Sequence, residues 1–354
     1  MKKLSMASAG FKLSPTARLK YNSGKREPRE LKSLLVGAVT ITAIFGCLPK
    51  SVQAASLGSF DQIYTFGDSA SDNGNTFKAT AGLLPPSPPY YEGRYSNGPV
   101  WVEDLASKLD VPLTDLAFAG ATTGQSNVLN QQFSLNLPGV QQQIDSFTAA
   151  HPSANSKALY IVWAGFNDYL GGGATSNTET VENLSTAVKS LNEAGAKNIM
   201  VPNLPDLGKY PVTTNTPNAP LLSTLSKKHN SDLAQALANL SQAPGSDINI
   251  ISFDVNSLFS AAIDQPENFG FTNVTDACFN TTTLNVCSNP DQYLSWDGLH
   301  VTARAQEVLA ESAFSALSSN SPSKSVPEPT STLGVLAFGA AALMVQKLGS
   351  LLSR

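Results

Sequence analysis

Three residues of the chain could together perform nucleophilic catalysis. Ser69 lies in the stretch IYTFGDSASDNGN, where a hydroxyl follows an apolar run at what the sequence predicts to be a strand-to-helix turn. Asp297 and His300 lie three residues apart in WDGLH, a spacing at which a carboxylate and an imidazole can form a hydrogen bond. A serine that attacks an acyl carbon needs a base to take its proton and a group that orients the base. We therefore expect Ser69 to be a nucleophile, His300 its base and Asp297 the residue that orients His300.

The other two histidines are expected to lie on the surface. His151 precedes a proline in the turn-like segment AAHPSAN, and His229 lies in the polar segment SKKHNSD. His300 is therefore the histidine that the sequence favours as a base.

Hydrolysis of an ester also requires hydrogen-bond donors for the tetrahedral oxyanion. The candidates are the backbone N–H groups of Ser69 and Gly120 and the side-chain amide of Asn167, because each lies at or just after the end of a predicted strand. Asp68 and Asp72 flank the nucleophile, and we interpret both as residues that cap a helix and shape the turn.

The elements that must position these residues alternate between strands and helices. Strands are predicted at residues 62–66, 116–120, 158–165, 198–204 and 248–255, and helices at 99–109, 176–195, 221–240 and 302–317. Ser176 and Glu179 form a capping-box pattern, and Gly195 is expected to end that helix. This order predicts a parallel five-stranded sheet with helices on both faces, and its loops after the strands carry the candidate residues.

Four segments in this order resemble the conserved blocks of the GDSL, or SGNH, hydrolases: FGDSASDNGN, LAFAGATTG, GFNDYL and WDGLHVT. YYEGRYSNGPVWVEDLA and VPNLPDLG resemble intervening segments of that family. The resemblance implies a flavodoxin-like three-layer α/β/α fold and hydrolysis of acyl esters without a cofactor. It also implies the roles given above for Ser69, Gly120, Asn167, Asp297 and His300.

The chain departs from the family pattern at three positions. Ala70 stands where the family name has leucine, and Asp115 and Ala119 stand where asparagine and glycine are common.

Similar hydrolases act on triglycerides, phospholipids, thioesters and acetylated sugars, so a carbohydrate acetylesterase is one alternative to a lipase or general esterase. The other is an envelope or matrix surface protein that keeps the fold without activity.

Two cysteines, Cys278 and Cys287, remain if Cys47 is removed with a signal peptide. An even pair at close spacing in an exported chain predicts a disulfide, although two free thiols are the alternative. Two cysteines without nearby histidines give an incomplete zinc site, so no metal is expected.

The two ends of the chain predict export. Residues 1–54 hold ten Lys/Arg and two Asp/Glu. Within them, a basic region at 1–32 is followed by an apolar run at 33–48 and small residues, which is typical of a signal peptide with a long basic region. A lipoprotein site at Cys47 is the alternative. The acidic remainder does not favour nucleic-acid binding.

The catalytic domain is expected at residues 55–320. Residues 321–354 form a Ser/Pro linker and an apolar segment that resembles a PEP-CTERM sorting signal, with VPEP at 326–329. That resemblance implies a sorting machinery as partner and processing or anchoring at the cell envelope. A plain buried or membrane-associated helix is the alternative.

Overall fold

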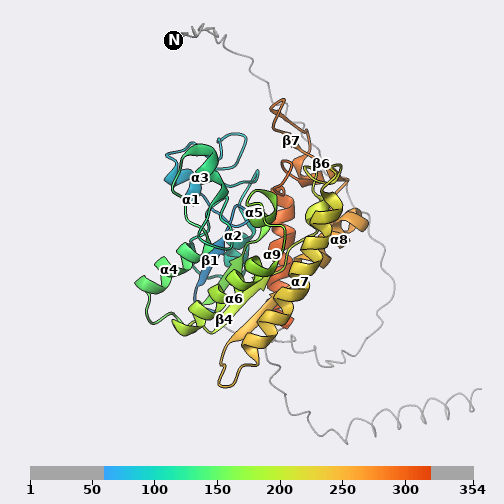
Figure 1. Cartoon of the computed structure of the whole chain (residues 1–354). Helices are drawn as coiled ribbons and strands as arrows, with labels where there is room; N and C mark the ends of the chain where they lie inside the picture. Colours follow the sequence, from blue (N-terminus) through green and yellow to red (C-terminus); the bar gives the residue numbers. More distant parts are fainter. Residues whose placement is uncertain (1–59, 320–354) are drawn as a thin grey trace, which may run out of the picture. The chain divides into compact units, whose positions relative to one another are not determined.

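A computed structural model describes residues 60–319 of the chain (Figure 1). The strands of the central sheet are β1 Ile63–Gly67, β2 Leu113–Asp115, β3 Leu159–Trp163, β4 Asn198–Pro202 and β5 Asn249–Phe253. The α-helices are α1 Asn75–Ala79, α2 Trp101–Leu109, α3 Val128–Phe133, α4 Val140–Ala150, α5 Phe166–Leu170, α6 Thr178–Glu193, α7 Ala219–Ser241, α8 Val255–Asp264 and α9 Ala303–Ser319. Short elements complete the described part: η1 Leu207–Lys209, η2 Pro266–Phe269, η3 Pro290–Gln292, β6 Asn273–Ala277, β7 Phe279–Asn280, β8 Asn285–Val286 and β9 Tyr293–Ser295.

The five strands form one parallel sheet in the order β2-β1-β3-β4-β5. Ile63 of β1 pairs with Leu113 on one side and with Leu159 on the other. The sheet confirms the predicted fold class, a parallel five-stranded sheet with flanking helices. Because all strands run the same way, the loops that follow them lie at one edge of the sheet.

The two faces of the sheet are covered by different helices. Along β3, Leu159, Ile161 and Trp163 face the core that includes α2 and α9. The intervening Tyr160 and Val162 face the core that includes α4, α6 and α7. Figure 1 shows α6 and α7 running side by side over this second face. Burial on both faces explains why β3 is a continuous apolar run.

The second strand was predicted wrongly at residues 116–120, because β2 ends at Asp115. After Asp115, the N–H groups of Leu116 and Phe118 still donate to the carbonyls of Thr65 and Gly67, but side chains bond the rest of the segment. Asn75 donates to the carbonyls of Asp115 and Ala117, and the N–H of Ala119 donates to Asp72 and Thr76. The apolar run is therefore a loop, and it ends at the predicted oxyanion residue Gly120.

The helix predicted at 176–195 is α6, but its capping box at Ser176 was also wrong. Asn177 is the N-cap residue, and its side chain donates to Asp232 rather than capping the helix. The C-terminal end follows the prediction, since Gly195 lies just beyond the helix with a φ of +115°.

The predicted signal peptide (1–54), the alternative lipoprotein site at Cys47 and the PEP-CTERM-like segment (321–354) lie outside the described residues. From Phe60 to Ser319, no helix combines the length and the apolar character needed to cross a membrane.

Candidate active site

Ser69 lies in a tight turn directly after β1. The carbonyl of Asp68 accepts the N–H groups of Ser71 and Asp72, which closes the turn. Gly67 allows β1 to approach β3 closely, since a Cβ atom there would lie 2.2 Å from the carbonyl oxygen of Trp163. The predicted strand-to-helix turn was wrong in one respect: α1 begins only at Asn75, so the N–H of Ser69 is not at a helix N-terminus.

Ser69, His300 and Asp297 form a continuous hydrogen-bonded chain. The Oγ atom of Ser69 lies 2.9 Å from Nε2 of His300, and Nδ1 of His300 lies 2.8 Å from Oδ2 of Asp297. The loop between β9 and α9 carries both His300 and Asp297. The structure thus brings together the three residues that the sequence predicted as nucleophile, base and orienting group.

The carboxylate of Asp297 is buried but stays ionised. Burial opposes its charge, yet the electrostatic interaction with His300 and the hydrogen bonds from His300 and Tyr90 outweigh burial and lower the pKa of Asp297 to about 2. An ionised Asp297 accepts the Nδ1–H of His300, which leaves Nε2 free to take a proton from Ser69.

The three predicted oxyanion residues, Ser69, Gly120 and Asn167, line one pocket together with His300. Within residues 60–319, the backbone N–H groups of Ser69 and Gly120 donate to no protein acceptor. Asn167 differs, because its Nδ2 donates to the Ala121 carbonyl (3.0 Å) and to Oδ2 of Asp68 (3.3 Å). Two donors are therefore available, and the third would exchange one of its present bonds for a substrate oxygen.

Gly120 adopts a backbone conformation that favours glycine, with a φ of +79°. A Cβ atom there would lie 2.6 Å from Oδ1 of Asn127 and from Cγ of Leu129. Its bare backbone therefore suits a position where an N–H group must face the pocket.

The aspartates beside Ser69 hold the surrounding loops. Oδ1 of Asp68 accepts the N–H of Ala70, and burial raises the pKa of Asp68 to about 7. Asp72 accepts the N–H groups of residues 74–76 at the start of α1 and that of Ala119. The interpretation of Asp72 as a cap of α1 agrees with these bonds, and Asp72 also ties the Ser69 loop to the Gly120 loop.

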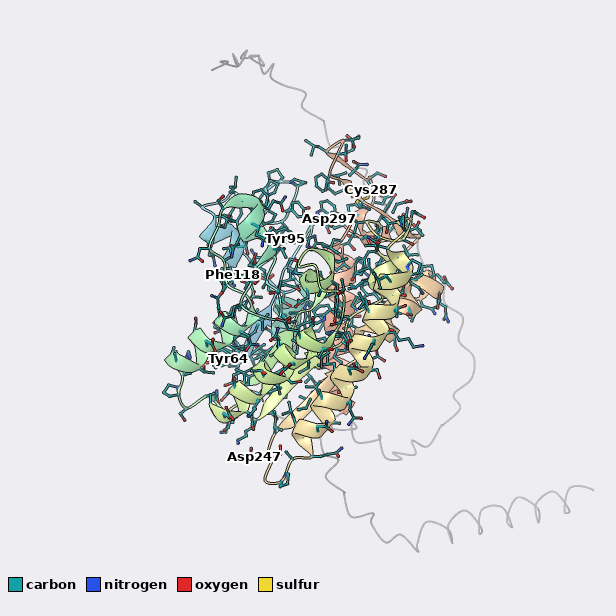
Figure 2. All side chains as sticks on the ribbon, in the orientation of Figure 1. Tyr64, Tyr95, Phe118, Asp247, Cys287 and Asp297 are labelled. Atoms are coloured by element: carbon teal, nitrogen blue, oxygen red, sulfur yellow. A yellow bond between two sulfur atoms is a disulfide. The ribbon has the colours of Figure 1, made fainter. Side chains whose placement is uncertain are left out.

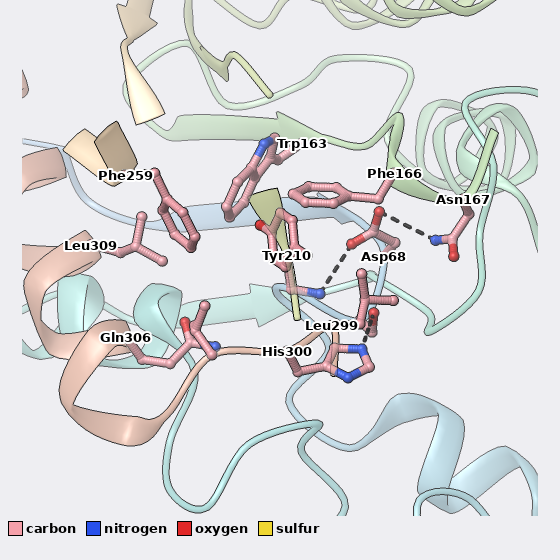
Figure 3. Close-up of a pocket in the computed structure, with 13 residues that line it drawn as sticks. Asp68, Trp163, Phe166, Asn167, Tyr210, Phe259, Leu299, His300, Gln306 and Leu309 are labelled. Carbon is pink, nitrogen blue, oxygen red and sulfur yellow. Dashed lines mark hydrogen bonds between the residues drawn. The ribbon is translucent and has the colours of Figure 1, made fainter. Parts of the chain in front are cut away.

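Two pockets meet at Ser69, Asn167, Leu299 and His300. One is small and enclosed, about 30 Å³, and contains the side chains of Trp163, Phe166, Tyr210, Phe259 and Leu309 (Figure 3). The other is wider, about 230 Å³, and is lined mainly by Tyr95, Val128, Leu129, Leu170 and Leu299. Both pockets present mostly apolar walls to the serine.

A family model described as GDSL-like lipase/acylhydrolase matches residues 63–313. The chain belongs to this family. The phosphatidylcholine-sterol acyltransferase of Aeromonas hydrophila is 32% identical over 243 residues, which cover 67% of this chain and 71% of that protein. The thermolabile hemolysin of Vibrio parahaemolyticus is 29% identical over 270 residues, which cover 71% of this chain but only 62% of the hemolysin.

Solved structures are matched more weakly than these sequences. The structure of a lipolytic protein of the G-D-S-L family from Veillonella parvula aligns over 72% of this chain and 96% of that protein. The alignment has a TM-score of 0.42 and 16% sequence identity. The assignment of this GDSL hydrolase to its family rests on the sequence matches.

His229 is buried, so its predicted place on the surface was wrong. Its Nδ1 lies 2.9 Å from the hydroxyl of Tyr169, and its Nε2 has no hydrogen-bond partner among the described residues. Burial lowers the pKa of His229 to about 4, so the ring is neutral near pH 7. His151 is exposed, as predicted.

A disulfide joins Cys278 and Cys287 and closes the hairpin of β7 and β8, which agrees with the predicted pairing. In Figure 2, Cys287 lies at the same end of the molecule as Asp297 and Tyr95, whereas Asp247 lies at the other end.

Residues 60–319 contain no group of three or more His, Cys, Asp or Glu side chains that could hold a metal ion.

The contribution of Tyr90 was missed. Tyr90 was not predicted as a site residue, but its hydroxyl donates to Oδ2 of Asp297 at 2.6 Å. Tyr90 lies in the family-like segment YYEGRYSNGPVWVEDLA, but nothing in that segment indicates that its hydroxyl binds a residue some two hundred positions away.

Proposed function

We propose that this GDSL hydrolase is an exported serine esterase or lipase that cleaves carboxylic esters. Its nucleophile is Ser69, its base is His300, and Asp297 orients the base. The observation that carries the proposal is the continuous hydrogen-bonded chain from Ser69 Oγ through His300 to Asp297.

The reaction follows from this geometry. Ser69 Oγ attacks the carbonyl carbon while its proton passes to Nε2 of His300, and Asp297 stabilises the imidazolium. The N–H groups of Ser69 and Gly120 and the amide of Asn167 stabilise the oxyanion. When the C–O bond breaks, the alcohol leaves with the proton from Nε2, and a water molecule then attacks the acyl-enzyme by the same route.

The wider pocket supports an apolar acyl group of moderate length. An apolar cavity of about 150 Å³ accommodates benzene, which has six carbons. We therefore expect a pocket of about 230 Å³ to favour acyl chains of about four to eight carbons over palmitoyl chains. Each buried methylene contributes about 0.8 kcal/mol, or about fourfold in kcat/KM, until the pocket is full.

A polar pocket next to it favours a second candidate, esters of sugars or other polar alcohols. This pocket shares Val128 and Gly171 with the apolar one and is lined by hydroxyl and amide side chains, including Thr122, Gln125 and Asn183. An acetylated polysaccharide would place its sugar there and its acetyl group at Ser69. Hydrolysis of acetylated xylan in preference to p-nitrophenyl hexanoate would favour this candidate.

The central test compares Ser69→Ala with Ser153→Ala on a p-nitrophenyl ester series from acetate to palmitate. Ser153 is exposed in the loop before β3, at the opposite edge of the sheet. We expect Ser69→Ala to lose hydrolysis and labelling by a fluorophosphonate, with an unchanged melting curve, while Ser153→Ala keeps both. Full activity in Ser69→Ala would contradict the proposal, and an inactive wild-type protein would favour a surface protein without activity.

Export is part of the proposal and rests on the predicted signal peptide and on the disulfide. N-terminal sequencing of the protein recovered from the culture medium or the cell envelope tests it. We expect a mature chain that begins near residue 55. A full-length chain confined to the cytoplasm would contradict export.

A further inference from the structure

The carboxylate of Asp297 accepts four hydrogen bonds. Oδ1 accepts the backbone N–H groups of Leu299 (2.8 Å) and His300 (2.7 Å). Oδ2 accepts Nδ1–H of His300 (2.8 Å) and the hydroxyl of Tyr90 (2.6 Å). Three of the four donors belong to the same loop as Asp297, and only Tyr90 comes from a distant part of the chain.

The ring of Tyr90 is held by aromatic neighbours. Its centroid lies 5.7 Å from that of Phe279 and 6.5 Å from that of Trp296, both in edge-to-face arrangements. Phe279 directly follows Cys278, so the disulfide hairpin forms one wall of the Tyr90 site. A ring packed in this way has few alternative positions for its hydroxyl.

The loop that carries Tyr90 is bonded to the chain around His300. Within the loop, the N–H of Tyr91 donates to the carbonyl of Ser96. The hydroxyl of Ser96 then donates to the carbonyl of Val301 (2.9 Å), and Asn97 Oδ1 accepts the N–H of Ala303 (2.8 Å). Tyr90 therefore approaches Asp297 from a segment that is itself hydrogen-bonded to the chain directly after His300.

The hydroxyl of Tyr90 remains a donor. Burial and the nearby charge of Asp297 raise the pKa of Tyr90 far above the neutral range. A buried carboxylate with four donors is satisfied in its ionised form and cannot rotate without losing bonds.

We propose that Tyr90 is a positioning residue of the catalytic triad, which holds Oδ2 of Asp297 in line with Nδ1 of His300. This inference rests on the proposed function. Without the hydroxyl, one oxygen of Asp297 keeps only its bond to His300, and the imidazole loses part of the restraint that directs Nε2 to Ser69. The effect reaches the substrate only through Asp297 and His300.

The test uses Tyr90→Phe, which keeps the ring, and Tyr91→Phe as the matched control. Tyr91 is 39% exposed and does not contact the triad, so its variant is expected to behave as the wild type. Since hydrogen bonds to charged groups are among the stronger ones, we expect Tyr90→Phe to lower kcat about 5- to 50-fold with KM nearly unchanged. The rate of fluorophosphonate labelling of Ser69 should fall by a similar factor.

A double-mutant cycle with Asp297→Asn shows whether Tyr90 acts through Asp297. If it does, Tyr90→Phe has almost no further effect on kcat in the Asp297→Asn background. A lower melting temperature with unchanged kcat, or an equal loss of kcat in both backgrounds, would overturn the inference. Ser69→Ala in the same assay separates the two proposals, because activity in that variant refutes the proposed function itself.

Discussion

Asn167 and Asp68 are joined by a hydrogen bond of 3.3 Å between the amide nitrogen of the first and a carboxylate oxygen of the second. Asp68 thus occupies a donor that the proposed reaction needs for the oxyanion. The bond is long, and Asp68 keeps its bond to the N–H of Ala70 when it breaks. Binding of an ester carbonyl would therefore replace Asp68 at Asn167 and leave Oδ2 of the buried Asp68 without this bond.

We predict that Asn167→Ala lowers kcat about 10²- to 10³-fold, because loss of one oxyanion donor weakens binding of the transition state more than that of the substrate. Steady-state kinetics on a p-nitrophenyl ester measures this effect. Asn239→Ala, an exposed change on α7, is the control and should retain wild-type kcat. A change confined to KM would mean that Asn167 only positions the substrate.

We predict that the free energy of unfolding of the wild type falls as the pH rises from 5 to 7. In Asp68→Asn this fall should be smaller. Burial raises the pKa of Asp68 from 3.8 to about 7 in the folded state, so the folded protein binds a proton that the unfolded chain releases. Stability from this group is present at low pH and is lost as pH rises through this range, by up to about 1.4 kcal/mol per pH unit. Urea unfolding of both proteins at several pH values measures the slopes, and equal slopes would contradict the assignment to Asp68.

The opposite dependence is expected from His229. Burial lowers its pKa from 6.5 to about 4, so the unfolded chain binds a proton that the folded protein does not. Stability from His229 is present above pH 6.5 and is lost as pH falls toward 4. We predict that His229→Gln shows a shallower loss of stability over this interval than either the wild type or the exposed-site control His151→Gln. A slope as steep as that of the wild type would disagree with a buried neutral ring.

We predict that replacement of both Cys278 and Cys287 by serine lowers the free energy of unfolding by about 2–3 kcal/mol, because the disulfide restricts the unfolded chain. Activity should fall as well, since the hairpin packs against Tyr90 through Phe279. Thiol titration of the denatured exported protein should find no free thiol. Two titratable thiols would show that the pair is not bonded in the mature protein.

The sheet could be predicted from the sequence because the buried strands β1, β3 and β4 are continuous apolar runs flanked by amphipathic helices. The loop at 116–120 was predicted as a strand for the same reason, since its residues are also apolar. Its conformation depends on side chains remote in sequence, Asp72 and Asn75, and no local pattern reports such bonds.

The candidate residues Ser69, Asn167, Asp297 and His300 could be chosen because few residue types perform their chemistry and each follows a strand. His229 could also have been placed correctly. It lies four residues after Leu225 and four before Leu233, both buried, so it belongs to the apolar stripe of α7 despite its polar neighbours. Tyr90 could not have been placed, because its role depends on a contact between segments that are remote in sequence.

Ser69 and His300 stand near opposite ends of the described chain, 231 residues apart. On the proposed roles, a ribosome-bound chain that has emerged as far as α8 already carries its nucleophile but has no base to activate it. Hydrolytic competence therefore arises only after the loop between β9 and α9 has been synthesised and docks beside β1. The order of the residues along the chain thus delays ester cleavage until all five strands of the central sheet have been synthesised.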